Sequence, residues 1–143
     1  MKTVVVNAQS IERKWFIVDA SELTLGRLAS KVAQLLIGKG KVAYSPNQDH
    51  GDNVIVINAD KVQLTGKKPD TKFYFRHSQY PGGAKFRSFK EQMQIDSSQV
   101  VRHAVHGMVP KNARGRSIMK KLHIYGGDQH PHAAQQPETL SLS

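Results

Sequence analysis

Cysteine is absent from this chain of 143 residues, and so is any long apolar run. Without cysteine the chain forms no disulfide bond and no cysteine-based zinc site, which fits a reducing compartment. No run approaches the ~18 apolar residues that a membrane span needs. Near the start, a Thr-Val-Val-Val run is too short for a signal-peptide core, and the Arg/Ser-rich character of a transit peptide is missing. We therefore expect a soluble cytosolic protein.

Acidic residues are scarce where basic residues are dense. The net charge is +10 and the isoelectric point is about 10.0. Residues 61–90 hold eight Lys/Arg against one Asp/Glu, and residues 91–121 hold six against two. Residues 1–60 are nearly balanced, at seven against six, and residues 122–143 have no Lys or Arg. This distribution favours a polyanionic partner, above all nucleic acid, for the middle of the chain.

The first half of the chain predicts a strand, a helix and a second strand. Residues 15–19 form an apolar run typical of a buried strand. From Leu25 to Leu36 apolar residues recur at helical spacing; Thr24 is placed to cap the start of this helix, and Gly38 to end it. Residues 54–57 are a second buried-type strand, so the segment predicts a right-handed βαβ unit.

The second half predicts shorter elements. Residues 73–75 are a third strand candidate, and we expect the rings of Phe73 and Phe75 to be buried in it. A capping box between Ser88 and Glu91 predicts a helix over 89–95. A loop at 80–83 separates the strand candidate from this helix. After the helix, the sequence predicts a break and helix cap at 96–98, a second helix at 100–108 and a short strand at 122–124.

The length and these elements predict a single α/β domain spanning residues 1–143, with three or four mostly parallel strands and helices on the faces of the sheet. Residues 1–14 are expected to be an N-terminal extension. Residues 126–143 show no periodicity, and we expect an extended tail that is ordered only where a partner holds it.

Two basic clusters are the candidate binding residues. The first has aromatic residues among its members, which could be core residues or could stack on unpaired bases; its cations are Lys67, Lys68, Lys72, Arg76, Lys85, Arg87 and Lys90. The second consists of Lys111, Arg114, Arg116, Lys120 and Lys121. Arg116 and Lys120 would share a helix face, while Gly107 and Gly115 would let backbone approach a ribose-phosphate closely.

Signs of catalysis or of a metal site are weak. The Gly38-Lys-Gly-Lys and Thr65-Gly-Lys-Lys segments do not fit a phosphate-binding loop. Asp49, Asp52 and Asp60 could be proposed as acids, but no base pairs with them in the sequence. His123, His130 and His132 lack the cysteine or carboxylate partners of a closed zinc site. We expect no cofactor, no metal, no small-molecule substrate and no catalytic residues.

Several runs resemble the bacterial form of the family of large-subunit ribosomal protein thirteen. They occur in the family's order and spacing over nearly the whole chain. The matching runs are Asp19-Ala20, Leu25-Gly26-Arg27-Leu28-Ala29, Gly51-Asp52, Asn58-Ala59-Asp60-Lys61-Val62, Thr65-Gly66-x-Lys68, His77-Ser78, Gly82-Gly83, Gly107-Met108-Val109-Pro110, Gly115-Arg116, Leu122-x-Ile124-Tyr125 and His132-Ala133-Ala134-Gln135-Gln136-Pro137. Arg76 stands where the family often has His.

This resemblance implies a three-layer α/β/α fold around a four-stranded parallel sheet. It also implies a structural protein of the large ribosomal subunit, in the cytoplasm of a bacterium or encoded in an organelle, that binds large-subunit ribosomal RNA, joins early in assembly and has other ribosomal proteins as neighbours. The RNA-binding residues that follow from the clusters and the resemblance are Lys67, Lys68, Lys72, Arg76, His77, Lys85, Arg87, Gly107, Lys111, Arg114, Gly115, Arg116, Lys120 and Lys121.

Two other functions stay open on the residues alone. A DNA-binding regulator could use the helices at 89–108 as a helix-turn-helix, although the second helix carries only Arg102 and two histidines. A nucleotide-using α/β enzyme is less favoured because the phosphate-binding motif is missing.

Overall fold

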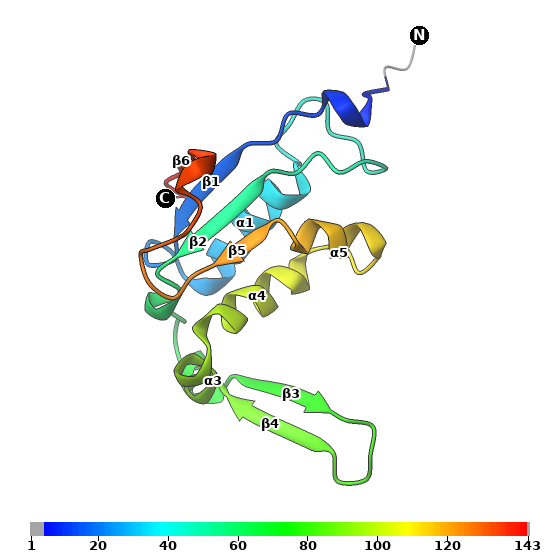
Figure 1. Ribbon diagram of the computed structural model, residues 1–143. Helices are drawn as coiled ribbons and strands as arrows, with labels where there is room; N and C mark the ends of the chain where they lie inside the picture. Colours follow the sequence, from blue (N-terminus) through cyan, green and yellow to red (C-terminus); the bar gives the residue numbers. More distant parts are fainter. Residues whose placement is uncertain (1–4, 143) are drawn as a thin grey trace.

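A computed structural model describes residues 5–142 (Figure 1). Its elements in chain order are η1 (Ala8–Ser10), β1 (Trp15–Asp19), α1 (Leu25–Ile37), β2 (Asn53–Ile57), η2 (Ala59–Lys61), α2 (Lys68–Thr71), β3 (Phe73–His77), β4 (Ala84–Ser88), α3 (Phe89–Ile95), α4 (Ser97–Met108), α5 (Ala113–Met119), β5 (Leu122–Ile124), η3 (Ala133–Gln135) and β6 (Glu138–Thr139). The predicted βαβ unit and the two helices after residue 88 are confirmed.

The main sheet is parallel throughout, with strand order β5-β2-β1-β6. Its fourth strand comes from the C-terminal tail, where Glu138 pairs with Phe16 and Thr139 with Ile17. The tail therefore contributes a strand to the chain's own sheet, which was not predicted from the sequence. Two residues of strand with polar side chains give no sequence signal of their own.

Helices α1 and α4 cover one face of this sheet. Strand residues such as Val18 and Val54 pack there against Leu28 of α1 and Val101 of α4, and all four side chains are fully buried. The apolar spacing of each helix explains this burial, since residues three and four apart share one face. Because the apolar stripe of α4 faces the core, α4 is a packing helix and does not present itself as a recognition helix.

The opposite face is covered by the tail. Trp15 stacks on His123 with ring centroids 5.4 Å apart, and His132 lies against both rings at 5.3 and 4.6 Å. Tyr125 shares a hydrogen bond of 2.6 Å with His132. Ile55, at 0% exposure, is buried although it is not part of the helix-side core. The sheet thus lies between a helical layer and the tail segment that carries η3, which confirms the predicted α/β class with a parallel four-stranded sheet.

Helix ends follow the predicted signals with one exception. Gly38 ends α1 with a φ of +82°, and its N–H donates to the Gln34 carbonyl at 2.9 Å. The Ser88–Glu91 capping box begins α3, and the carboxylate of Asp96 accepts from the Ser98 N–H at 3.0 Å to begin α4. Thr24 occupies the N-cap position of α1 but its side chain makes no capping hydrogen bond, so that prediction is wrong.

Candidate nucleic-acid interface

The first basic cluster lies on and around a separate β-hairpin. Strands β3 and β4 pair antiparallel, outside the parallel sheet, and project from the α/β body beyond α3 (Figure 1). The loop between them turns tightly: Gly82 has a φ of +69°, and the Gly83 N–H donates to the Tyr80 carbonyl at 2.9 Å. A Cβ on Gly83 would lie 2.8 Å from the Tyr80 carbonyl oxygen, so a larger residue would force the turn to shift.

Cations on the hairpin have few internal partners. Arg76 and Lys85 are directly opposite each other and exposed, a like-charge pair that destabilises a hairpin unless an anion lies between them. The Lys72 ammonium lies 5.4 Å from the Tyr74 ring centroid, and Arg87 donates to Gln92 Oε1 at 3.0 Å. Residues 71–90 contain no Asp or Glu. All charged side chains of the hairpin are thus positive.

At the base of the hairpin, one cation of the first cluster has a carboxylate partner. Lys67 and Lys68 are exposed at the start of α2, while Lys90 forms an ion pair with Asp70 at 2.5 Å. Both side chains of that pair are about two-thirds exposed, at 65% and 70%, so the pair contributes little to stability. His77 ends β3 with its Nδ1 accepting from the Gln79 N–H at 2.9 Å, and stays exposed.

The expected burial of Phe73 and Phe75 is wrong. Their exposed fractions are 60% and 61%, and Phe86 on the partner strand is 70% exposed. The expectation assumed a strand of the central sheet, with both faces covered, whereas a peripheral hairpin covers only one. The inward ring is Tyr74, which packs edge-on against His103 of α4 with centroids 5.2 Å apart. Burial raises the pKa of the Tyr74 hydroxyl.

The second basic cluster lies on α5 and beside it. The side chain of Asn112 caps this helix by accepting from the Gly115 N–H at 2.9 Å. Gly115 is buried, and a Cβ there would lie 1.7 Å from the Pro110 carbonyl oxygen. The backbone around Pro110, here called the 110 turn, therefore requires glycine at position 115, whether or not RNA approaches it. Arg116, Lys120 and Lys111 are exposed, and Lys111 donates to the His106 carbonyl at 3.1 Å.

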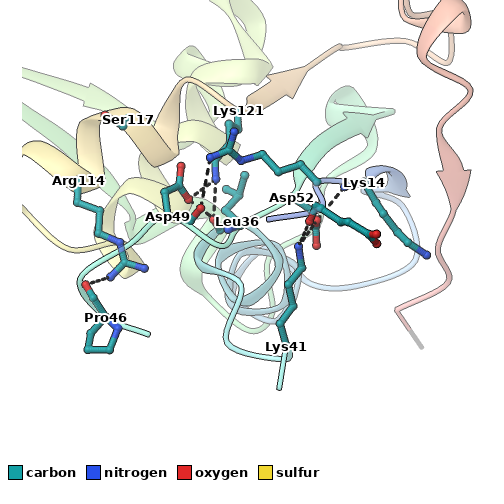
Figure 2. Close-up of polar contacts among 12 residues, drawn as sticks. Lys14, Leu36, Lys41, Pro46, Asp49, Asp52, Arg114, Ser117 and Lys121 are labelled. Carbon is teal, nitrogen blue, oxygen red and sulfur yellow. Dashed lines mark hydrogen bonds and ion pairs between the residues drawn. The ribbon is translucent and has the colours of Figure 1, made fainter. Parts of the chain in front are cut away.

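Arg114 and Lys121 point inward. Figure 2 shows Arg114 reaching the loop at 44–52, where it donates to the Pro46 carbonyl at 2.6 Å with its guanidinium 5.8 Å from the Tyr44 ring centroid. Lys121 pairs with Asp49 at 2.5 Å and donates to the Leu36 carbonyl at 3.3 Å. Arg114 thus ties the loop to α5, and Lys121 ties it to the end of α1.

Burial and pairing both act on the Lys121–Asp49 pair. Burial lowers the pKa of Lys121, and the Asp49 carboxylate offsets part of that effect. Burial alone would raise the pKa of Asp49, but hydrogen bonding and charge from Lys121, the Gly51 N–H and the charge of Arg13 bring it below its ordinary value. Each partner thus offsets the effect of burial on the other, and the side chain of Lys121 is only 12% exposed.

Asp52 and Asp60, the other two candidate acids, have structural partners. Asp52 is buried, pairs with Lys41 at 2.7 Å and accepts from the Lys14 N–H at 2.9 Å (Figure 2). Asp60 accepts a short hydrogen bond from the Ser97 hydroxyl. Each carboxylate ties two segments of the fold together.

A third group of cations went unnoticed in the sequence because residues 1–60 are nearly neutral overall. Lys14, Lys31, Lys39 and Lys41 line one hollow between the end of α1 and the C-terminal segment, with Leu140 and Leu142 at its apolar wall. Lys31, Lys39 and Lys41 come from α1 and the turn that follows it, and the fold brings Lys14 beside them.

His123 and His132 pack against Trp15 and against each other. Among residues 5–142 no group of three or more His, Cys, Asp or Glu side chains is arranged to hold a metal ion. No helix in the same range is long and apolar enough to cross a membrane.

Figure 1 places the two main clusters at the two ends of α4: the hairpin near its start and α5 beyond its end. The 12 residues of α4 span about 18 Å from end to end. The fold and this surface define a class of protein, a rigid α/β body that presents separated groups of cations to a polyanion.

Comparison with known proteins assigns the family. A model of the family described as ribosomal protein L13 matches residues 13–131. The chain is 55% identical over 142 residues to large ribosomal subunit protein uL13 of Lachnospira eligens, covering 99% of this chain and 100% of that protein. It is 54% identical over 140 residues to uL13 of Geobacillus kaustophilus, covering 98% and 97%. The chain belongs to the ribosomal protein L13 family.

Proposed function

We propose that this chain is a structural constituent of the large ribosomal subunit and takes part in translation as an RNA-binding protein. Its relatives are named as large ribosomal subunit proteins, and they match it over nearly their full length. The family's role is structural and not enzymatic. The chain works in the cytoplasm, within the ribosome, with large-subunit ribosomal RNA and neighbouring ribosomal proteins as its partners.

The observation that carries the RNA-binding role is the placement of unpaired, exposed cations at both ends of α4. We assign phosphate contacts to the exposed members of each group. At the hairpin these are Lys67, Lys68, Arg76, His77, Lys85 and Arg87, together with the half-buried Lys72, and at α5 they are Lys111, Arg116 and Lys120, beside the open backbone of Gly107. Arg114, Gly115 and Lys121 support the α5 group from behind through contacts with the 44–52 loop and the 110 turn.

The mechanism is electrostatic. Each cation that neutralises a phosphate releases counterions, and two groups on one rigid body tie two RNA segments together. Because the protein binds the compact arrangement of those segments and not the open one, it stabilises the folded RNA by mass action. A protein acting in this way is useful early in subunit assembly.

Sedimentation of a cell lysate on a sucrose gradient, at moderate and then high salt, tests the proposal with the chain followed by mass spectrometry. We expect it to travel with the large subunit in about one copy per particle and to survive the salt wash, since many phosphate contacts act together. A chain that stays in the light fractions at both salt concentrations would overturn the ribosomal assignment.

A further inference from the structure

The β3–β4 hairpin has two chemically different faces. Because strand residues alternate, directly opposed pairs share a face. One face carries Tyr74 with Arg87 and Arg76 with Lys85; the other carries Phe73 with Ser88, Phe75 with Phe86 and His77 with Ala84. The first face is turned toward the body, since Tyr74 packs against His103 of α4. The second, here called the ring face, is therefore turned away from the body.

Hairpin stability does not account for the ring face. Phe75 and Phe86 form a cross-strand pair with centroids 5.0 Å apart and planes inclined at 47°, which stabilises the pairing of the strands. Even so, these rings remain 61% and 70% exposed. Phe73 and His77 lie opposite Ser88 and Ala84, whose small side chains leave the flanks of the rings open. Single exposed apolar residues are ordinary, but a row of rings on one face indicates a binding surface.

The charge around these rings selects the partner. Residues 71–90 carry five Lys or Arg and no carboxylate, so the ring face is embedded in a cationic element. An unpaired nucleotide matches both features, because its base offers a π-face to a ring and its phosphate pairs with a neighbouring cation. We propose that the ring face of the β3–β4 hairpin stacks on unpaired bases of RNA, while Arg76 and Lys85, exposed on the opposite face of the same hairpin, pair with other phosphates of that RNA. The proposal rests on the proposed function and specifies which form of RNA this element binds.

A matched pair of variants tests the stacking. F75L/F86L keeps the apolar volume and removes the rings, whereas F75Y/F86Y keeps the rings. The probes are a single-stranded RNA of mixed sequence, about 12 nucleotides long, and the duplex it forms with its complement. We expect F75L/F86L to bind the single strand about tenfold more weakly and the duplex unchanged, with F75Y/F86Y like wild type on both. The loss should be equal at low and moderate salt, because stacking releases no counterions.

A second measurement does not depend on how the leucine variant folds. A 2-aminopurine base placed in the single strand loses emission when it stacks, so wild-type protein should quench it and F75Y/F86Y should quench it equally. Equal single-strand binding by F75L/F86L and wild type, or absence of quenching, would overturn the stacking proposal and leave the ring face to a protein neighbour. A chain that binds neither probe and stays out of the large subunit would instead overturn the proposed function itself.

Discussion

Two arginines two positions apart on one helix do different work. Arg116 is exposed, whereas Arg114 holds the 44–52 loop through the Pro46 carbonyl and the Tyr44 ring. We expect Arg116→Ala to reduce the salt slope of RNA binding by about 1 without changing stability. We expect Arg114→Ala to lower the free energy of unfolding by about 1–2 kcal/mol, because it loses a charged hydrogen bond and a cation–π contact. Urea unfolding and RNA titration over a salt series measure both.

The outcome that contradicts this division is an Arg114→Ala variant as stable as wild type with the reduced slope of Arg116→Ala. Arg114 would then be a phosphate contact, as the basic run alone suggests.

Gly115 and Gly107, both candidates for close approach to RNA, form a second contrast at this scale. An alanine Cβ at Gly115 would meet the Pro110 carbonyl at 1.7 Å, while nothing lies within 4 Å of a Cβ at Gly107. Gly115→Ala should cost about 2–3 kcal/mol, because the 110 turn must move. Gly107→Ala should leave stability unchanged or raise it by up to about 1 kcal/mol through helix propensity. Thermal unfolding distinguishes them, and equal stabilities would contradict the structural account of Gly115.

At the scale of elements, the sequence predicts what is periodic or capped. Strands β1 and β2 and helix α1 follow from apolar runs and spacing, and α3 follows from its capping box. Strand β4 could not be predicted, because a half-exposed hairpin strand of sequence AKFRS has no apolar run. The burial of Phe73 and Phe75 could not be predicted either, because a triplet of aromatic residues is equally typical of a central strand and of a peripheral hairpin.

The positive charge of the candidate site could be predicted from the sequence, but not which of its cations are exposed. Basic density correctly locates the hairpin and α5 as cationic elements. It cannot separate Lys120 from Lys121, because the partner of Lys121, Asp49, lies 72 residues away and only the fold brings the two together. The third group of lysines shows the converse, since Lys14 joins Lys31, Lys39 and Lys41 only through the fold.

The junction between hairpin and body depends on the capping box. Ser88 Oγ accepts from the Glu91 N–H at 3.3 Å, and the Ser88 N–H donates to Glu91 Oε2 at 3.0 Å. Ser88→Ala should therefore lower the free energy of unfolding by about 1 kcal/mol. Ser30→Ala, on the exposed side of α1, is the matched control and should be neutral. Urea unfolding measures both variants, and an equal loss of stability in the two would contradict the role of the capping box.

For the molecule as a whole, the tail makes stability depend on pH. Burial lowers the pKa of His123 below its ordinary 6.5, and the charges of His132 and Arg102 lower it further. Burial likewise lowers the pKa of His103. The unfolded chain therefore binds more protons just below pH 6.5, so stability falls as the pH drops from there toward the folded pKa.

The unfolding midpoint should accordingly be lower at about pH 5.5 than at about pH 7.5. His123→Phe keeps a ring against Trp15 and should weaken the pH dependence, while His77→Asn, exposed on the β3–β4 hairpin, should retain it. Trp15 is the chain's single tryptophan and reports this site by fluorescence. An unaltered pH dependence in His123→Phe would exclude His123 as a source.

The separation of the two cation groups by α4 gives the last expectation for the whole molecule. R76A/K85A at the hairpin and R116A/K120A at α5 should each reduce the salt slope of binding to large-subunit RNA by about 2, and the fourfold variant by about 4, because each group neutralises its own phosphates. Affinity should fall more steeply when the first group is removed than when the second is, since bivalent attachment is lost at the first step. Salt titrations of the variants measure both quantities. If either double variant alone abolished the whole slope, the two groups would contact a single RNA segment, and α4 would not act as a spacer.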